Sequence, residues 1–192
     1  MSGPIAGPDG VLRCPWGLSS PEYVAYHDDE WGRPLETDDA MFERLTLEGF
    51  QSGLSWLIVL RKRPAFRTAF AGFAMQQVAD FDERDVERLM ADADIIRNRA
   101  KIVATIGNAG ALQDLPGGLL HHVTSFRPKT PPKPPKTLAD LPGQTDESKA
   151  LAADLRKRGV RFVGPTTAYA LMQATGIVDD HLVGCVSRGR WT

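Results

Sequence analysis

The chain has 192 residues, of which 42% are hydrophobic, 24% charged and 8% aromatic, and its formal net charge is −1. These proportions are typical of a globular protein and exclude disordered, collagen-like and disulfide-rich scaffolds. The near-zero charge argues against a generally basic protein that coats nucleic acid, so a polyanionic partner would have to meet a local basic patch. We expect a single domain over residues 13–192 behind a flexible tail over residues 1–12.

Cysteine usage and the N-terminus indicate a reducing compartment. Cys14 and Cys185 are the two cysteines of the chain, too few for the disulfide framework of a secreted domain. Met1–Val11 contains no positively charged side chain and no apolar run of a signal peptide. The longest apolar stretch, around Leu54–Leu60, is far below the about 20 residues of a membrane span. We therefore expect a cytoplasmic monomer with no membrane contact and no obligate protein partner.

The predicted elements are almost all helices, because alternation of period two is nowhere sustained. Asp38 and Asp39 can cap a first long helix. The apolar run that follows, over residues 54–60, should stop at the Arg-Lys-Arg-Pro sequence of residues 61–64, and Phe66, Phe70 and Phe73 then continue at helical spacing. The sequence therefore predicts an all-α fold.

Later helices are predicted from their caps. Asp82 could cap a short helix, and another should run from about Asn98 to Leu112. Ser148–Arg158 should form a helix that ends at a glycine, and Pro165 should open one that reaches Ala174.

The segment Arg127–Pro142 interrupts this helical pattern. It holds five prolines between residues 128 and 135, interleaved with Lys129, Lys133 and Lys136. This composition is typical of an extended polyproline-type connector. A proline-rich ligand for a partner is the alternative, and a solvated loop between two helices is the simpler interpretation.

Four candidate metal ligands lie near the two ends of the chain. Cys14 and His27 are near the start, and His181 and Cys185 are four positions apart near the end. Two thiolates and two imidazoles form a closed tetrahedral zinc set, and the second pair would share one face if helical. With no position open for water, the zinc would be structural and would tie the ends together. Four unrelated residues are the alternative.

A cluster of aromatic residues surrounds one unusual acid. Glu48 stands between two apolar helical runs and precedes two turn-forming glycines, where a carboxylate would be partly desolvated. The aromatic residues of the same stretch are Trp16, Tyr23, Tyr26, Trp31 and Trp56. They could simply be core, with the acid as a helix-end charge. The functional interpretation is a pocket that stacks a flat ligand and contacts its polar edge through the carboxylate.

Several strings of this sequence occur together in one known family. They are Arg13-Cys14-Pro15-Trp16, Tyr26 to Gly32, Leu47 to Trp56, and Phe162 to Thr167, followed by Asp180, His181 and Cys185. Their order and spacing resemble those of the bacterial 3-methyladenine DNA glycosylase I family, collinearly over roughly residues 13 to 186. The resemblance implies an all-α, helix-hairpin-helix glycosylase-like fold, with the hairpin motif at about residues 148–174 and a structural zinc.

The resemblance also implies an activity. Enzymes of this kind flip 3-methyladenine out of alkylated double-stranded DNA and hydrolyse its N-glycosidic bond, without a lyase step. The alternative is a non-catalytic helix-hairpin-helix module that binds damaged or structured DNA, which would have no need for Glu48. A zinc hydrolase is disfavoured by four protein ligands.

Site residues follow from the resemblance position by position. Glu48 and Tyr26 match residues that hydrogen-bond the excised base, Trp56 matches the ring stacked on it, and Trp31, Tyr23 and Trp16 complete the aromatic wall. Gln51 and Leu54 match the turn that enters the duplex. Gly164, Pro165, Thr166 and Thr167 match the family's hairpin. With the basic Lys157 and Arg158, its backbone N–H groups would contact DNA phosphates, and the alternative is an ordinary helix C-cap. Cys14, His27, His181 and Cys185 match the zinc ligands.

Other features receive weaker assignments. Asp179 and Asp180 fall where many helix-hairpin-helix glycosylases have a catalytic Asp, a residue that this family lacks, and we expect them to support His181 or to cap a helix. His121 and His122, in a Gly/Leu-rich turn, are expected to be solvated. Thr124 stands where the family usually has Trp, and this departure could alter the substrate range.

Overall fold

The computed structural model describes residues 3–191, and within these residues the chain is mostly helical. The short elements are β1 (Ile5–Ala6), β2 (Leu12–Arg13), η1 (Pro15–Leu18), η2 (Ala71–Phe73) and η3 (Leu138–Asp140). The α-helices are α1 (Pro21–Asp29), α2 (Asp38–Gln51), α3 (Trp56–Ala69), α4 (Met75–Ala79), α5 (Glu83–Ala91), α6 (Arg99–Leu112), α7 (Gly118–Thr124), α8 (Asp146–Lys157) and α9 (Pro165–Ala174). No helix in the described part of the chain is long and apolar enough to cross a membrane.

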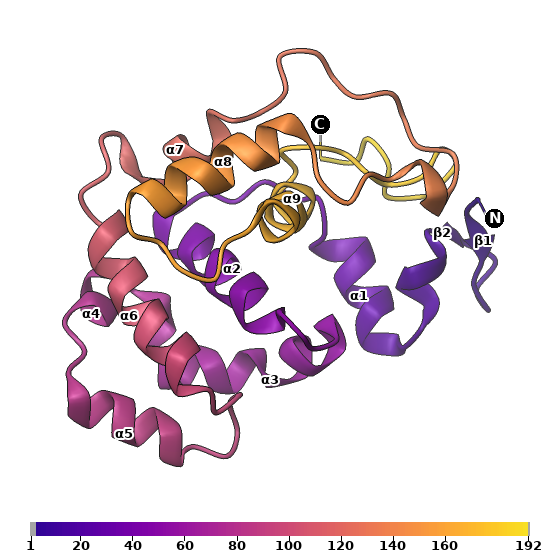
Figure 1. Cartoon of the computed structure of the whole chain (residues 1–192). Helices are drawn as coiled ribbons and strands as arrows, with labels where there is room; N and C mark the ends of the chain where they lie inside the picture. The colour runs from indigo at the N-terminus through magenta and orange to yellow at the C-terminus, as the bar shows by residue number, and fades with distance from the viewer. Residues whose placement is uncertain (1–2, 192) are drawn as a thin grey trace.

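Helix α2 lies at the centre of the molecule (Figure 1). It packs against α3, α6 and α7, and against α9, which in turn packs along α8. After α9 the chain returns to the N-terminal hairpin, where the backbone N–H of Val186 donates to the carbonyl of Leu12 at 2.9 Å. The segment around Val186 therefore lies against the N-terminal hairpin, whereas the end of the described chain lies farther away, near α9 (Figure 1).

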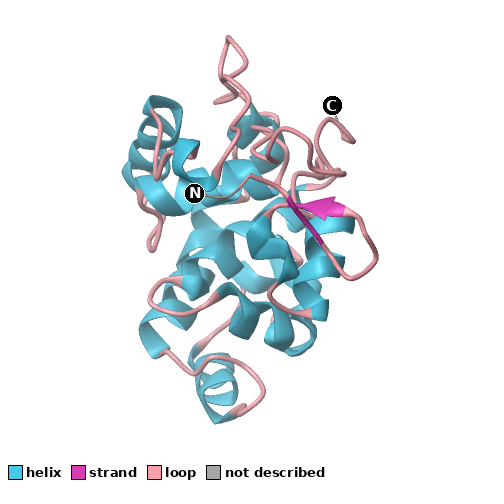
Figure 2. Ribbon diagram, turned by 90° about the vertical axis from the view of Figure 1, so that its right-hand side faces the viewer, coloured by secondary structure: helices cyan, strands magenta, loops and turns pink. Residues whose placement is uncertain are grey.

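A small hairpin precedes the helices. Ile5 pairs with Arg13 and Ala6 with Leu12, in an antiparallel sheet on the rim of an otherwise helical molecule (Figure 2). The prediction that regular structure begins at about Arg13 is wrong. Strands of two residues are too short to produce a recognisable alternation of side chains, so the sequence pattern carries no signal for them.

The helix caps are confirmed for the most part. Asp82 caps α5 through a capping box, and Asn98 caps α6 by accepting from the N–H of Lys101. Asp38 and Asp39 do not cap their own helix, because Thr37 is the N-cap of α2. Their side chains instead accept backbone N–H bonds at the starts of α7 and α4, at 2.7 and 2.8 Å.

The expected stop before residue 64 is wrong, because α3 continues through Pro64 to Ala69. An internal proline costs a helix about 3 kcal/mol. Val59, Phe66 and Ala69 are buried along this helix, and Phe66 stacks in the core with Phe70 at 6.0 Å between ring centroids. Burying apolar side chains of this size contributes about 1.5–3 kcal/mol each, which is enough to offset the proline.

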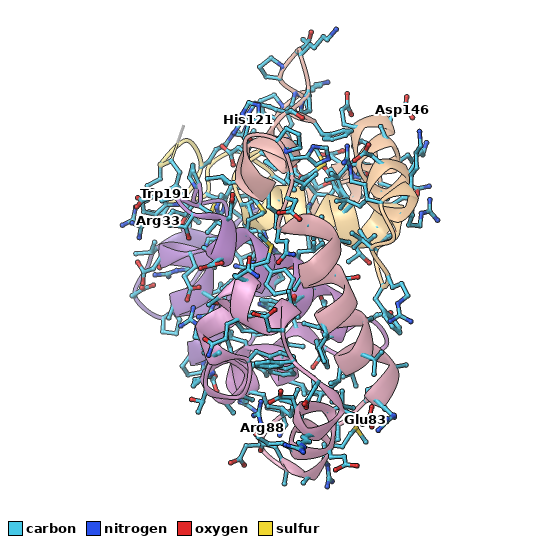
Figure 3. All side chains as sticks on the ribbon, turned by 90° about the vertical axis from the view of Figure 1, so that its left-hand side faces the viewer. Arg33, Glu83, Arg88, His121, Asp146 and Trp191 are labelled. Atoms are coloured by element: carbon cyan, nitrogen blue, oxygen red, sulfur yellow. The ribbon has the colours of Figure 1, made fainter. Side chains whose placement is uncertain are left out.

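The segment over residues 127–136 forms no helix, as the proline pattern predicts. The carbonyl of Pro135 accepts from the backbone N–H of Val183 at 2.8 Å, so the segment is attached to the C-terminal part of the chain. The prediction for the histidines is partly wrong. His121 is exposed on α7 (Figure 3), whereas the Nε2 of His122 lies 2.7 Å from Asp154 on α8.

Candidate active site and metal centre

A cavity of ≈ 500 Å³ opens between η1, α1, α2, the start of α3 and α9. Its lining consists of Trp16, Ser19, Tyr23, Tyr26, Trp31, Glu48, Gln51, Trp56, Leu141, Ala170 and Gln173. All five predicted aromatic residues and the predicted carboxylate therefore line one cavity. Its volume lies within the range of roughly 300–1,000 Å³ that is usual for small-molecule pockets.

The aromatic rings meet mostly edge to face. Trp16 lies between Tyr23 and Trp31, with centroid distances of 5.9 and 4.9 Å and interplanar angles of 79° and 77°. Tyr26 and Trp56 are 5.5 Å apart and tilted by 44°. Such pairs stabilise each other by about 0.5–1.5 kcal/mol beyond their burial, so they hold the wall in one shape.

Glu48 is the single carboxylate of this lining and is only 6% exposed. It lies in the last turn of α2. Burial raises the pKa of this carboxyl to about 7, although the Arg44 guanidinium, 3.9 Å away, opposes the shift. This carboxyl therefore titrates closer to neutral pH than an exposed glutamate does, and such perturbed groups are common at functional sites.

Arg44 is a buried residue that the sequence analysis does not identify as part of the site. One of its N–H groups donates to the Tyr26 hydroxyl at 2.8 Å. Its guanidinium carbon lies 5.1 Å from the ring centroid of Tyr26 and 5.0 Å from that of Trp56. The i, i+4 spacing of Arg44 and Glu48 on one helix is the sequence signal that could have found it.

Trp56 is buried at the start of α3, and its indole Nε1–H has no hydrogen-bond partner within residues 3–191. A buried donor without an acceptor costs about 1–3 kcal/mol. Groups of this kind are tolerated mainly where a ligand or water meets them. Trp56 is thus equipped to contribute both a flat face and a donor.

The turn after α2 projects from the cavity toward solvent. Gln51 lines the cavity, and the turn then passes through Gly53, at φ 84°, to Leu54, which is 40% exposed. Lys101 anchors this turn from α6, because its buried ammonium donates to the carbonyls of Phe50 and Ser52 at 2.9 and 2.8 Å. Burial lowers the pKa of Lys101. Its sequence context, a basic helix start, gave no sign of this role.

The predicted helix pair near the C-terminus is present as α8 and α9. Gly164 is the N-cap of α9 and Pro165 is its first residue, and no side chain caps this helix. The exposed Lys157 and Arg158 lie at the end of α8, although the Nε of Arg158 donates to Asp154 at 2.8 Å. The N–H groups at the start of α9 are therefore unpaired with side chains.

The four predicted metal ligands, Cys14, His27, His181 and Cys185, are buried, and their ligand atoms all lie within 4.8 Å of one another. The Sγ of Cys185 is 3.4 Å from the Nε2 of His27 and 3.7 Å from the Nδ1 of His181. A tetrahedral zinc with bonds of about 2.0–2.3 Å separates its ligands by roughly 3.3–3.8 Å. This group could therefore hold a metal ion.

Contrary to the prediction, the segment that carries His181 and Cys185 is not helical. Residues 177–185 form turns and irregular chain after α9, and His181 and Cys185 converge because the segment folds back on η1 and α1. The i, i+4 argument is wrong, whereas the grouping of the four residues is confirmed. Tertiary packing against Cys14 decides their positions.

The ring nitrogens that face away from the cluster have partners. The Nδ1 of His27 lies 2.8 Å from Asp28, and the Nε2 of His181 lies 3.0 Å from the carbonyl of Trp31. Arg13 in turn donates to Asp28 at 2.8 Å. Such partners fix the orientation and tautomer of a metal-binding imidazole. Neither Asp28 nor Arg13 was predicted at this site from the sequence.

Asp179 and Asp180 organise the C-terminal segment. Asp179 accepts from the backbone N–H of His181 at 3.1 Å, which agrees with the expected support for this ligand. Asp180 accepts from the hydroxyl of Tyr169 at 2.5 Å and from the amide of Gln173 at 2.7 Å. Thr124 is outside the cavity lining and bonds the carbonyl of Leu120 within α7.

Comparison with known proteins places this chain in a family. The family model described as "Methyladenine glycosylase" matches residues 16–188. This chain belongs to the methyladenine glycosylase family. A relative named DNA-3-methyladenine glycosylase 1, from Escherichia coli, is 48% identical over 177 residues, which cover 90% of this chain and 95% of that protein. Another, DNA-3-methyladenine glycosylase from Haemophilus influenzae, is 40% identical over 181 residues, with coverages of 91% and 97%.

Solved structures of family members share the fold. A crystal structure of 3-methyladenine DNA glycosylase I superposes with a TM-score of 0.87 and 43% sequence identity, covering 92% of this chain and 99% of that one. The Staphylococcus aureus enzyme, described in work on 3-methyladenine recognition, has a TM-score of 0.86 and 32% identity, with coverages of 92% and 96%. The mostly helical architecture is thereby confirmed.

Proposed function

We propose that this protein is a DNA repair glycosylase that excises 3-methyladenine from alkylated double-stranded DNA. The observation that carries the proposal is the buried Glu48 in an aromatic cavity large enough for a purine. The names of the relatives at 48% and 40% identity support it. A module that only binds DNA would gain nothing from a buried carboxylate, which costs stability.

Recognition of the flipped base would rest on its charge. A nucleotide methylated at N3 of adenine is cationic, and a cation over Trp or Tyr gains about 0.5–2 kcal/mol from the ring, which neutral adenine lacks. We assign Trp56 to stacking on the base and Trp16, Tyr23 and Trp31 to the wall. Glu48 would accept a hydrogen bond from the exocyclic amine, and its charge further favours the methylated base.

Cleavage would require little acid catalysis. The positive charge of the methylated base weakens the N-glycosidic bond, because the base departs as a neutral molecule. Water replaces the base on the sugar carbon, so hydrolysis leaves free 3-methyladenine and an abasic site without a covalent enzyme intermediate. Glu48 and Tyr26 would hold the base in the orientation from which it leaves.

DNA would bind across the face that carries the turn between α8 and α9 and the turn after α2. We assign Leu54 and Gln51 to the space that the flipped base leaves in the duplex, because the exposed leucine lies in the turn between Gln51 and Trp56, which both line the cavity. Gly164, Pro165, Thr166 and Thr167 would hold a phosphate on the N–H groups at the start of α9, with Lys157 and Arg158 nearby. Both α3 and α9 lack side-chain caps in the described residues, and both begin on this face.

Zinc is the metal that the Cys14, His27, His181 and Cys185 set would hold, because two thiolates and two imidazoles at tetrahedral spacing are typical of structural zinc. The ion would tie the N-terminal hairpin to the C-terminal segment and would take no part in the reaction. We further propose that the protein acts as a monomer on chromosomal DNA in a bacterial cytoplasm.

Incubation with methylated duplex DNA, followed by chromatography of the released bases, tests the activity. We expect 3-methyladenine from the unmodified protein and at least tenfold less from Glu48→Gln, because a charged acceptor contributes about 1.5–3 kcal/mol. Glu43→Gln is the matched control, since Glu43 lies on the same helix but pairs with Arg67 at 2.9 Å. Absence of free base from intact, DNA-binding protein would refute the proposal.

A further inference from the structure

Arg44 is unusual among the buried arginines of this protein. Its side chain is buried in the middle of α2, yet its nearest carboxylate, that of Glu48, is 3.9 Å away. Arg13 and Arg63, by contrast, each make close paired contacts with carboxylates, at 2.8 Å to Asp28 and 2.5 Å to Glu30. Burying a guanidinium without a close carboxylate is costly, so its position requires another explanation.

The contact that Arg44 does make determines how Tyr26 can bind. A guanidinium has only donors, so the Tyr26 oxygen must accept the 2.8 Å hydrogen bond. The hydroxyl hydrogen of Tyr26 is then available to a different acceptor. Because Tyr26 lines the cavity, Arg44 turns this tyrosine into a donor toward whatever occupies it.

The donor and the carboxylate form a complementary pair. One edge of adenine presents an amine donor beside a ring nitrogen acceptor. An ionised Glu48 accepts from the amine, and Tyr26 donates to the ring nitrogen. Without Arg44, the hydroxyl hydrogen could instead point at Glu48, and Tyr26 would no longer donate to the base.

Arg44 also supplies the positive charge that faces Glu48. Tyr26 approaches from α1, and the residues that face the cavity from α3 and α9, namely Trp56, Ala170 and Gln173, carry no charge. The next acid, Glu30, is engaged with Arg63. Farther along α2, Glu43 is paired with Arg67.

We propose that Arg44 is a positioning residue for base excision, which presents the Tyr26 hydroxyl as a donor and acts as the counter-ion of Glu48. The inference rests on the proposed glycosylase function. It is consistent with the pKa of Glu48, which burial raises to about 7 and which Arg44 keeps from rising further.

The test measures 3-methyladenine release from methylated duplex DNA between pH 6 and 9 for Arg44→Met, Arg44→Lys and the unmodified protein. An opposite charge at this distance shifts a carboxyl pKa by roughly one to three units, so the acid limb of the Arg44→Met profile should move up by about that amount. Release at pH 7 should fall at least about fivefold and recover in part toward pH 9. Arg44→Lys, which keeps the charge, should return the limb toward its original position.

Arg63→Met is the matched control, because it removes another largely buried guanidinium, which hydrogen-bonds Glu30 and, among the described residues, neither Tyr26 nor Glu48. We expect its pH profile to keep the midpoint of the unmodified protein, whatever its melting temperature. An unshifted acid limb in folded Arg44→Met, or an equal shift in Arg63→Met, would overturn the inference. If the unmodified protein itself releases no base, the proposed function fails instead. Should Arg44→Met not fold, Tyr26→Phe decides instead: full activity of this variant would equally refute the role, because the hydroxyl that Arg44 presents would then contribute nothing.

Discussion

The cluster of Cys14, His27, His181 and Cys185 and the aromatic cavity are two buried polar sites built from neighbouring stretches of chain, and the hydrogen bonding of their polar groups differs. In the cluster, the outward nitrogens of His27 and His181 have partners at 2.8 and 3.0 Å. In the cavity, Glu48 has a raised pKa and the indole N–H of Trp56 has no partner among the described residues. Hydrogen bonds therefore fix the imidazoles of the cluster in place, whereas polar groups of the cavity remain free to bind a ligand.

Removing a cluster ligand should have the largest effect. Cys185→Ser is expected to lose the bound zinc and most of the cooperative unfolding transition, because structural zinc contributes about 10 kcal/mol or more of apparent binding energy at pH 7. Metal analysis and thermal unfolding measure both. His122→Gln, a histidine outside the cluster, should keep about one zinc per chain. Equal metal content in both variants would contradict the structural role.

Glu48→Gln should separate stability from activity. The variant is expected to retain zinc and to melt at the same or a higher temperature at pH 8, since a neutral amide replaces a buried charge. Excision should nevertheless fall by about 10- to 100-fold, the value of a lost charge-assisted hydrogen bond. Calorimetry and base release on the same preparation check this. If stability fell together with activity, Glu48 would be needed for folding, and its role in base binding would be contradicted.

Stability should depend on pH through the same carboxyl. The pKa of Glu48 is about 7 in the folded protein, against 4.5 as its ordinary value. The stability associated with the protonated form is therefore complete below about pH 4.5 and is lost as pH rises through 7. Urea unfolding should show Glu48→Gln and the unmodified protein alike at pH 4.5, and the variant up to about 3 kcal/mol more stable at pH 8. No difference at pH 8 would mean that Glu48 is solvated.

Asp28→Asn should have the smallest effect. The change weakens the hydrogen bond that orients the His27 imidazole but removes no candidate ligand. Zinc affinity should therefore fall by about 10- to 100-fold, while the protein stays folded in excess zinc. Competition with a zinc chelator measures the affinity. Base release in saturating zinc should match that of the unmodified protein, and reduced release under those conditions would show that the two sites are coupled.

Local signals predicted much of the helical framework. The caps Asp82 and Asn98, and Pro165 at the start of α9, act within one turn of the chain and appear where expected. Predictions failed where distant contacts dominate. Pro64 stays inside α3 because the helix buries a core face, and Asp38, the first residue of α2, bonds α7.

The residues missed at the two sites are mostly charged. Arg44, Lys101 and Arg13 are buried, although arginine and lysine are usually exposed, so their types gave no reason to place them inside. Each binds a partner that is distant in the chain or one helical turn away. Lys101, for example, donates to the carbonyl of Phe50. Only packing brings such partners within hydrogen-bond distance.

The sequence by itself determined the helical class, the family, the aromatic residues around Glu48 and which four Cys and His residues are candidate metal ligands, because these depend on residue types and on spacing along the chain. The tertiary structure alone decided that Cys14 meets Cys185, that Glu48 is buried and that Arg44 lies behind Tyr26. Burial and long-range proximity set the charge and the hydrogen-bond direction of a group, and neither is a property of local sequence.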